Sequence, residues 1–283
     1  MDCSGLFRGA LATRVRRSLL TLVVLIVSAA SAFAETAPVK PKFGPLATSI
    51  QQSRDYFRTH DAPDYWALSP YYVPQISGSA CSVATIAIMM NVMLGLPAWG
   101  PETLVSQQSL LEKVDSKQWA EKSAQDGEGL TFEEFKTYVA LSLEAYGLKA
   151  DLETFKPADG GEATLARLRA LLVENEGSDD DIVLLYFNQG AVTGDWDGPH
   201  ISPLGAYDID RRRVLIMDVD RQFYIPYWTD DETLLDAMLR PAPAEQGVLA
   251  GETGGLIRVT AHRGTAHEVV RGSEPERRSR ARQ

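Results

Sequence analysis

Residues 75–95, QISGSACSVATIAIMMNVMLG, join a polar loop to a long apolar run, and a cysteine stands at the junction. The run from 82 to 94 is apolar on nearly all sides, which is typical of a buried helix. Gly95 and Pro97 follow it and are typical of a helix end. The stretch therefore predicts a central helix with Cys81 at its beginning.

The rest of the chain predicts helices first and strands later. Helices are expected at 46–59, in short pieces over 101–125, at 162–175, and from the N-cap Thr131 to Gly147, where Glu134 completes a capping box. Residues 60–80 predict a loop, ADLETF and IVLLYFN predict strands, and three aspartates at 179–181 predict a solvated turn rather than a metal site. Beyond residue 200, ISPLGAYD, RRVLIMDV, QFYIPYW and GGLIRVTA predict strands, with a helix in DDETLLDAML. This order favours an α+β fold with an antiparallel sheet.

The two ends of the chain differ from the middle. Four arginines up to residue 17, an apolar run from 19 to 27 and the triplet Ala32-Phe33-Ala34 are typical of a signal peptide over 1–34. An uncleaved membrane anchor is the alternative, but the run is shorter than the roughly 20 residues of a span. Residues 263–283 are Arg-rich and predict a disordered tail. We therefore expect a periplasmic domain over 35–262.

The net charge and the cysteine content limit the partners and the reactive groups that this protein is expected to have. The formal charge is −10, and removal of 1–34 takes away four arginines and one aspartate, which leaves about −13. Such an acidic protein is not expected to bind nucleic acid or an anionic membrane. Cys3 leaves with the signal peptide, so Cys81 is the remaining thiol. It is either a small buried apolar residue or a reactive thiol, because a helix N-terminus and a nearby histidine both favour the thiolate.

His200 and Asp218 are the candidates for partners of this thiol. His200 begins a predicted strand, and Asp218 ends a nearly continuous apolar strand, where an unpaired carboxylate is costly. A hairpin with its turn at 208–210 pairs Tyr207 with Arg211 and places His200 opposite Asp218 on one face. Cysteine, histidine and aspartate are the parts of a papain-like triad, and the amide of Gln75 can act as an oxyanion donor together with the Cys81 N–H.

Three stretches resemble the phytochelatin synthase family of papain-like cysteine enzymes: QISGSACS, GLTFEEFKTYVALSLEAYGLKADL and GPHISPLGAYDIDRRRVLIMDVDRQFYIPYW. The resemblance implies a nucleophile helix packed on an antiparallel sheet. It implies Cys81 as nucleophile, His200 as general base and acid, Asp218 as the residue that orients it, and Gln75 in the oxyanion hole. Arg221 and Tyr224 match residues beside the acyl site, which implies substrate binding.

The resemblance also implies a reaction. Cys81 would take the γ-Glu-Cys group of glutathione, release glycine, and pass the acyl group to water or to a second glutathione, which gives phytochelatins. No metal site or cofactor is required, although cadmium or other heavy metals could stimulate through a metal-thiolate substrate. A homodimer is left open. The single-domain bacterial relatives, which this chain resembles, are mainly associated with glycine removal.

Some residues depart from the family pattern. Ser82 replaces a glycine and is expected to crowd the loop, Asp220 replaces a small residue, and Phe223 stands where the plant enzymes are often basic. The cysteine-rich C-terminal region of the plant enzymes has no counterpart in the sequence, so we expect hydrolysis to dominate. Two alternatives remain open: a non-catalytic protein that binds thiol peptides or metals, and a papain-like peptidase that acts on other peptides.

Overall fold

A computed structural model describes residues 43–95 and 104–262, all of which lie in one unit of the chain. Its strands form one antiparallel sheet in the order β1-β6-β5-β4-β3-β7-β2. The strands are β1 (Thr48–Ser49), β2 (Ala150–Phe155), β3 (Asp181–Asn188), β4 (Pro199–Asp208), β5 (Arg213–Ile216), β6 (Tyr227–Asp230) and β7 (Gly255–Ala261). The predicted signal peptide over 1–34 and tail over 263–283 lie outside the described residues.

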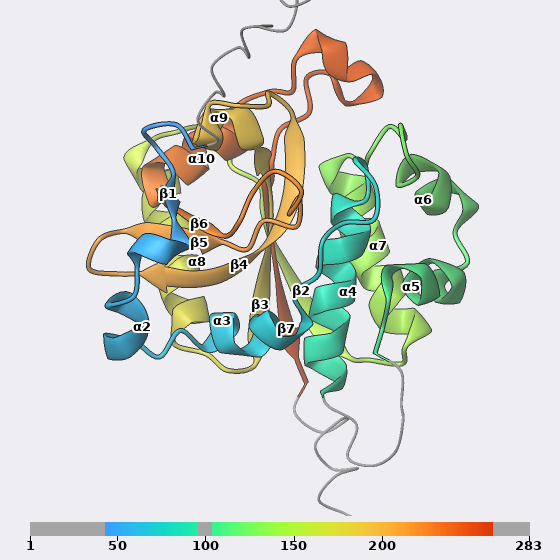
Figure 1. The fold of residues 1–283 in the computed structure, drawn as a ribbon, viewed down its shortest axis with the longest axis horizontal. Coiled ribbons are helices and arrows are strands. Elements are labelled where there is room, and N and C mark those ends of the chain that lie inside the picture. The colour runs from blue at the N-terminus through green and yellow to red at the C-terminus, as the bar shows by residue number, and fades with distance from the viewer. Residues whose placement is uncertain (1–42, 96–103, 263–283) are drawn as a thin grey trace, which may run out of the picture. The chain divides into compact units, whose positions relative to one another are not determined.

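Helices cover the sheet in two groups (Figure 1). The longer ones are α4 (Cys81–Leu94), α5 (Gln107–Val114), α7 (Phe132–Ala145), α8 (Glu162–Glu176) and α10 (Asp231–Leu239). The shorter ones are α2 (Tyr56–Thr59), α3 (Pro63–Leu68), α6 (Lys117–Lys122) and α9 (Gln189–Thr193), with 3-10 turns at Ile50–Gln52, Ser69–Tyr71 and Ala244–Leu249. None of the helices in the described part of the chain is long and apolar enough to span a membrane.

Strand β3 explains why the helices form two groups. All its residues are buried, and successive side chains point to opposite faces of the sheet. Leu184 and Tyr186 pack in a core with α4 and α7, whereas Val183, Leu185 and Phe187 pack in a core with α8 and α10. A strand buried on both faces is apolar throughout, as the sequence of β3 is.

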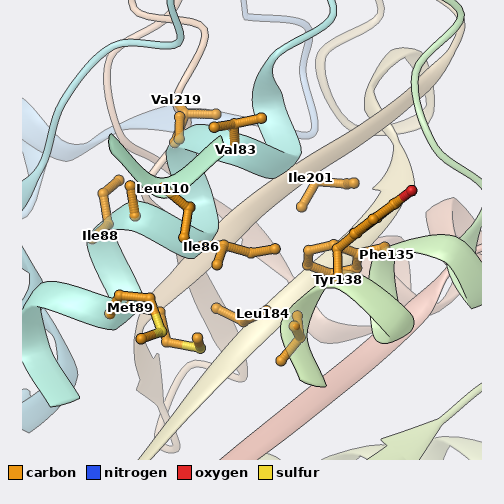
Figure 2. Packing of buried hydrophobic residues seen from close by; sticks show 14 of the residues in the cluster. Val83, Ile86, Ile88, Met89, Leu110, Phe135, Tyr138, Leu184, Ile201 and Val219 are labelled. Carbon is orange, nitrogen blue, oxygen red and sulfur yellow. The ribbon is translucent and has the colours of Figure 1, made fainter. Parts of the chain in front are cut away.

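Helix α4 lies in the first of these cores. Its residues from Ser82 to Asn91 are all buried, which confirms the central helix expected from the sequence. Figure 2 shows side chains of α4, among them Ile86 and Met89, beside those of α5 and α7 and of the sheet strands. The predicted α+β class, with the cysteine helix packed on an antiparallel sheet, is confirmed. The capping box of Thr131 and Glu134 at the start of α7 is confirmed as well.

Other local predictions were wrong. The helix expected at 46–59 is replaced by β1, a 3-10 turn and α2, because Thr48 and Ser49 pair with β6 at the edge of the sheet. The loop expected at 60–80 contains α3, whose first residue Pro63 suits that position in a helix. Of QFYIPYW only the end lies in β6, after Pro226, which has no N–H to donate. Asp181 of the expected solvated turn is buried and pairs with Arg258.

The predicted β4–β5 register was also wrong. Tyr207 pairs with Val214 and not with Arg211, a difference of three residues. The turn is longer than expected because the carboxylate of Asp208 accepts the Arg211 N–H and Arg212 adopts a positive φ of 51°. A bulge at Gly205 follows. Asp218 lies beyond the end of β5, so a ladder partner does not set its position.

Candidate active site

Cys81 is the first residue of α4, and its side chain is partly exposed. Among the described residues, no side chain caps this helix end, and no acidic residue stands in its first turn. The first N–H groups of a helix have no partner within the helix, so that of Cys81 is available to a ligand. The positive end of the helix dipole also favours a negative charge at the sulfur.

His200 is the second residue of β4 and lies opposite Phe187 of β3, whose ring it meets edge to face. The imidazole is almost fully buried. Its Nε2 atom lies 2.9 Å from Asp218 Oδ1 and 3.0 Å from Ser202 Oγ. Because a carboxylate only accepts, Nε2 carries a proton and donates it to the hydrogen bond with Asp218.

The structure brings Cys81, His200 and Asp218 together. Burial by itself would lower the pKa of His200, but the charge and hydrogen bond of Asp218, followed by the hydrogen bond and charge of Cys81, raise that pKa to about 10. The imidazole is therefore held in its protonated form at neutral pH. A protonated imidazole stabilises a thiolate beside it.

Asp218 is completely buried, and its carboxylate has four donors. Oδ1 accepts from His200 Nε2 and from the Asp220 N–H, and Oδ2 accepts from Gln189 Nε2 at 2.6 Å and from the Tyr227 hydroxyl at 2.9 Å. Burial would raise the pKa of Asp218, but His200 and these hydrogen bonds lower it. The carboxylate is therefore ionised, and its four hydrogen bonds and the charge of His200 compensate the cost of burying that negative charge.

Gln75 stands in the loop before α4, and its backbone N–H donates to the Val219 carbonyl at 2.9 Å. This bond joins the loop to the residue that follows Asp218. The side-chain oxygen Oε1 is buried and has no hydrogen-bond partner among the described residues.

The two predicted substrate-binding residues lie in different surroundings. Arg221 is exposed, and its guanidinium stacks on the ring of Tyr72, whose hydroxyl donates to the Asp218 carbonyl. Tyr224 is buried, and its hydroxyl donates to Asp195 at 2.9 Å in the loop between β3 and β4. A role in substrate binding stays a prediction for both.

A cavity of about 80 Å³ opens beside Cys81. Its walls include Ser79 and three glycines, together with Glu128, Trp196 and Gln246. Glu128 is the one charged residue among those that line it. The other lining residues are mostly apolar and include Leu130, Ile201 and Leu249.

Ser82 does not crowd the loop as expected. Its side chain is buried, and its hydroxyl accepts from Trp119 Nε1 at 3.0 Å. The position therefore joins α4 to α6 in the core, and the prediction of a crowded loop was wrong.

Among the described residues, one group of three possible metal ligands converges: His60, Asp208 and Asp210. The Asp208 carboxylate already accepts from Arg211 and Arg213, at 3.2 and 2.9 Å. Ion pairing thus accounts for this group. That the active site needs no metal stays a prediction.

Comparison with known proteins agrees with this geometry. The family model described as phytochelatin synthase matches residues 47–246, which include Cys81, His200 and Asp218. This chain belongs to the phytochelatin synthase family. It is 26% identical over 182 residues to glutathione gamma-glutamylcysteinyltransferase 3 of Lotus japonicus, over 62% of this chain and 34% of that protein. It is 24% identical to glutathione gamma-glutamylcysteinyltransferase 1 of Arabidopsis thaliana, over 62% of this chain and 33% of that protein.

The chain thus spans about a third of the length of these relatives. A solved structure of the Pseudomonas avirulence protein AvrPphB aligns with 69% of this chain and all of that one, at 13% identity and a TM-score of 0.32, which is too low to carry an argument. Enzymes of the phytochelatin synthase family are cysteine enzymes that in general need no cofactor.

Sequence reasoning missed Gln189, Ser202 and Tyr227, although all three contact the His200–Asp218 pair of this phytochelatin synthase family member. Gln189 lies in a segment that gave no sign of a site. Tyr227 lies in the stretch from Gly198 to Trp228 that resembles the family, but it was assigned no role there. Ser202 could have been predicted as a neighbour of His200, because residues two apart in a strand lie on the same face of the sheet.

Proposed function

We propose that this protein is a cysteine enzyme that removes glycine from glutathione. One observation carries the proposal: the thiol of Cys81 contacts buried His200, and His200 contacts buried Asp218. Cys81 also stands at the start of a helix that no side chain caps. Membership of the phytochelatin synthase family and relatives named glutathione gamma-glutamylcysteinyltransferase support glutathione as the substrate.

In the first half of the reaction, the Cys81 thiolate attacks the carbonyl carbon of the Cys–Gly bond. The carbonyl oxygen becomes an oxyanion, which the Cys81 N–H and the Gln75 amide stabilise. Protonated His200 gives its proton to the glycine nitrogen as the C–N bond breaks. Glycine leaves, and the γ-Glu-Cys group remains as a thioester on Cys81.

In the second half, water replaces glycine. Neutral His200 takes a proton from the water as its oxygen attacks the thioester carbon. The C–S bond then breaks, and γ-Glu-Cys leaves with the thiolate restored beside protonated His200. A second glutathione in place of water gives a phytochelatin, and a heavy metal enters such a reaction as part of a metal-thiolate substrate.

Arg221 is proposed to bind a carboxylate of glutathione. Its exposed guanidinium is held over Tyr72, and the hydroxyl of Tyr72 contacts the backbone of Asp218. This arrangement brings a positive charge near the His200–Asp218 pair on a protein that is otherwise acidic.

The test is incubation of the purified protein with glutathione, followed by mass spectrometry for glycine, γ-Glu-Cys and longer oligomers. Glycine should appear with the wild type, and Cys81→Ser should lower its release by orders of magnitude, because a serine hydroxyl is a much weaker acid than a thiol. Ser77→Ala, in the same loop, is the matched control. Digestion of a peptide library without glycine release from glutathione would favour the peptidase alternative instead.

We further propose that the protein is exported to the periplasm, on the basis of the arginines, apolar run and Ala32-Phe33-Ala34 near its N-terminus. N-terminal sequencing of protein from a periplasmic extract should begin at Glu35. Protein that keeps Met1 and remains with the membrane fraction would contradict export with cleavage.

A further inference from the structure

The second oxygen of Asp218 is held by two side chains that the triad does not include. Gln189 Nε2 donates to Oδ2 at 2.6 Å, and the Tyr227 hydroxyl donates to the same atom at 2.9 Å. Gln189 is 1% exposed and Tyr227 is 0% exposed. Neither donor is therefore available to substrate or to bulk water, and each is committed to Asp218.

The two donors come from different elements. Gln189 begins α9, immediately after β3, and Tyr227 begins β6. Asp218 itself lies in the segment that follows β5, where the β4–β5 ladder has ended. Asp218 has no partner in the β4–β5 ladder, and the side chains of Gln189 and Tyr227 both bind its Oδ2 atom.

A carboxylate torsion is broad and roughly two-fold, so an unrestrained Asp218 would have many orientations. With Oδ2 bound by Gln189 and Tyr227, Oδ1 is left for His200 Nε2 and the Asp220 N–H. The imidazole then has a fixed ring orientation beside Cys81, with which its side chain forms a hydrogen bond. Hydrogen bonds to a buried charged group are among the stronger ones in proteins.

Gln189 also holds the loop that lines the cavity beside Cys81. Its backbone N–H donates to the Gly198 carbonyl at 2.9 Å, which joins the two ends of the loop from 189 to 198. At Gly190 a side chain would approach the backbone oxygen of Trp196 to 2.7 Å, so the loop folds closely over the start of α9. Trp196 lines the cavity. One residue therefore connects the cavity wall to Asp218.

We propose that Gln189 and Tyr227 are positioning residues, which act on the reaction through Asp218 by directing its Oδ1 atom at His200. The proposal rests on the proposed function in so far as His200 is the acid and base of the reaction. Loss of the Gln189 or the Tyr227 donor should lower the reactivity of Cys81 beside His200 only while the Asp218 carboxylate is present.

The experiment is a double-mutant cycle. Tyr227→Phe and Gln189→Leu are each made in the wild type and in an Asp218→Ala background. Two rates are measured at pH 7: the alkylation of Cys81 by iodoacetamide, and glycine release from glutathione, with kcat and KM determined separately. Tyr207→Phe is the matched control, because Tyr207 is equally buried and its hydroxyl donates to Asp231, at 2.7 Å, and not to Asp218.

In the wild type, each of the two substitutions should lower kcat and the alkylation rate by about tenfold, the size expected for one hydrogen bond to a charged group, with KM little changed. In the Asp218→Ala background the same substitutions should change either rate by less than about twofold, since no carboxylate is left to direct. Tyr207→Phe should leave both rates as in the wild type.

Equal losses with and without Asp218 would overturn the proposal, and so would unchanged rates for Tyr227→Phe in the wild type. If Gln189→Leu does not fold, Tyr227→Phe still decides the question, because it removes one oxygen atom and keeps the ring. A wild type that alkylates normally but releases no glycine would contradict the proposed function, while the alkylation cycle would still test the roles of Gln189 and Tyr227.

Discussion

His200 Nε2 lies 2.9 Å from Asp218 Oδ1, although the two residues are not partners in the β4–β5 ladder. The β4–β5 ladder ends at Ile216, and the Met217 N–H still donates to the Pro203 carbonyl at 3.0 Å. Asp218 follows this last bond, and its carboxylate lies buried beside His200. The position of the pair therefore depends on where the pairing of β4 with β5 ends.

Replacement of His200 by alanine should abolish acyl transfer. We expect His200→Ala to lower turnover by about three orders of magnitude or more, because the members of a triad act as a unit. His60→Ala is the control, since His60 stacks on Tyr56 at the end of α2 and is not part of the triad. The measurement is glycine release from glutathione. Similar losses in both variants would show that stability, and not His200, is the cause.

The pH dependence should follow the raised pKa of His200. Because this pKa is about 10, the imidazole stays protonated through neutral pH, and kcat/KM should remain level up to about pH 8 and fall as the pH approaches 10. The folded-state pKa lies above the usual 6.5, so the stability that His200 contributes is present below pH 6.5 and is lost between 6.5 and 10. Rates and unfolding curves from pH 6 to 11 check both parts. A fall of activity centred near 6.5 would contradict the raised pKa.

Asp218→Asn should keep the fold and impair the reaction. The amide removes the negative charge that raises the pKa of His200, so burial then dominates and lowers that pKa. The upper limit of the pH profile should therefore move to lower pH, and kcat at pH 7 should fall by about 10⁴, the size known for the equivalent change in another triad. A fully active variant with an unchanged profile would contradict the role of Asp218.

Asp64 should lower stability at neutral pH. Its side chain is 3% exposed, and burial, together with the charges of Asp181 and Glu176, raises its pKa well above the usual range. The folded protein then holds a proton that the unfolded chain releases above about pH 4, so stability falls as the pH rises toward the folded-state pKa. Asp64→Asn should raise the free energy of unfolding, more at pH 8 than at pH 5.

Urea unfolding at the two pH values checks this, with Asp236→Asn as the control, because Asp236 is exposed and is not among the charges that raise the pKa of Asp64. A loss of stability for Asp64→Asn that is the same at both pH values would contradict a destabilising effect of the buried carboxyl through its raised pKa.

Hydrolysis should dominate over transfer to a second glutathione. Water is present at about 55 M, so an acceptor at millimolar concentration succeeds only if a second site positions it strongly. Acceptor glutathione is anionic, whereas the chain is acidic and has Asp220 beside Arg221, and Phe223 is 49% exposed at a position often basic in the plant enzymes. We expect glycine and γ-Glu-Cys in nearly equal amounts, with little oligomer and little stimulation by cadmium.

Phe223→Lys combined with Asp220→Ala should then shift the product ratio toward oligomers. Val248→Lys combined with Glu245→Ala is the control, because both residues are exposed and the two changes add the same charge elsewhere. Oligomers as the main product of the wild type, or an equal shift in the control, would contradict a local charge effect.

Several features could be predicted because they depend on local pattern. The apolar run after Cys81 is longer and more uniform than a surface helix allows, so its burial as α4 followed from the sequence. The capping box of Thr131 and Glu134 involves residues three apart, and its hydrogen bonds form within one turn. The resemblance of the His200–Asp218 segment likewise gave the triad, whose members the structure brings together.

Only the tertiary structure decided how those residues meet. The β4–β5 register differed by three residues because the Asp208 turn and the bulge at Gly205 change the pairing, and neither change follows from alternation alone. Thr48 and Ser49 became a strand because the sheet edge at β6 had free backbone groups to pair with them. Gln189 and Tyr227 reach Asp218 from elements that are distant in the sequence, and their convergence depends on the packed positions of β3, β5 and β6. Sequence pattern determines which face of an element is buried, but contacts between elements depend on packing that no single segment contains.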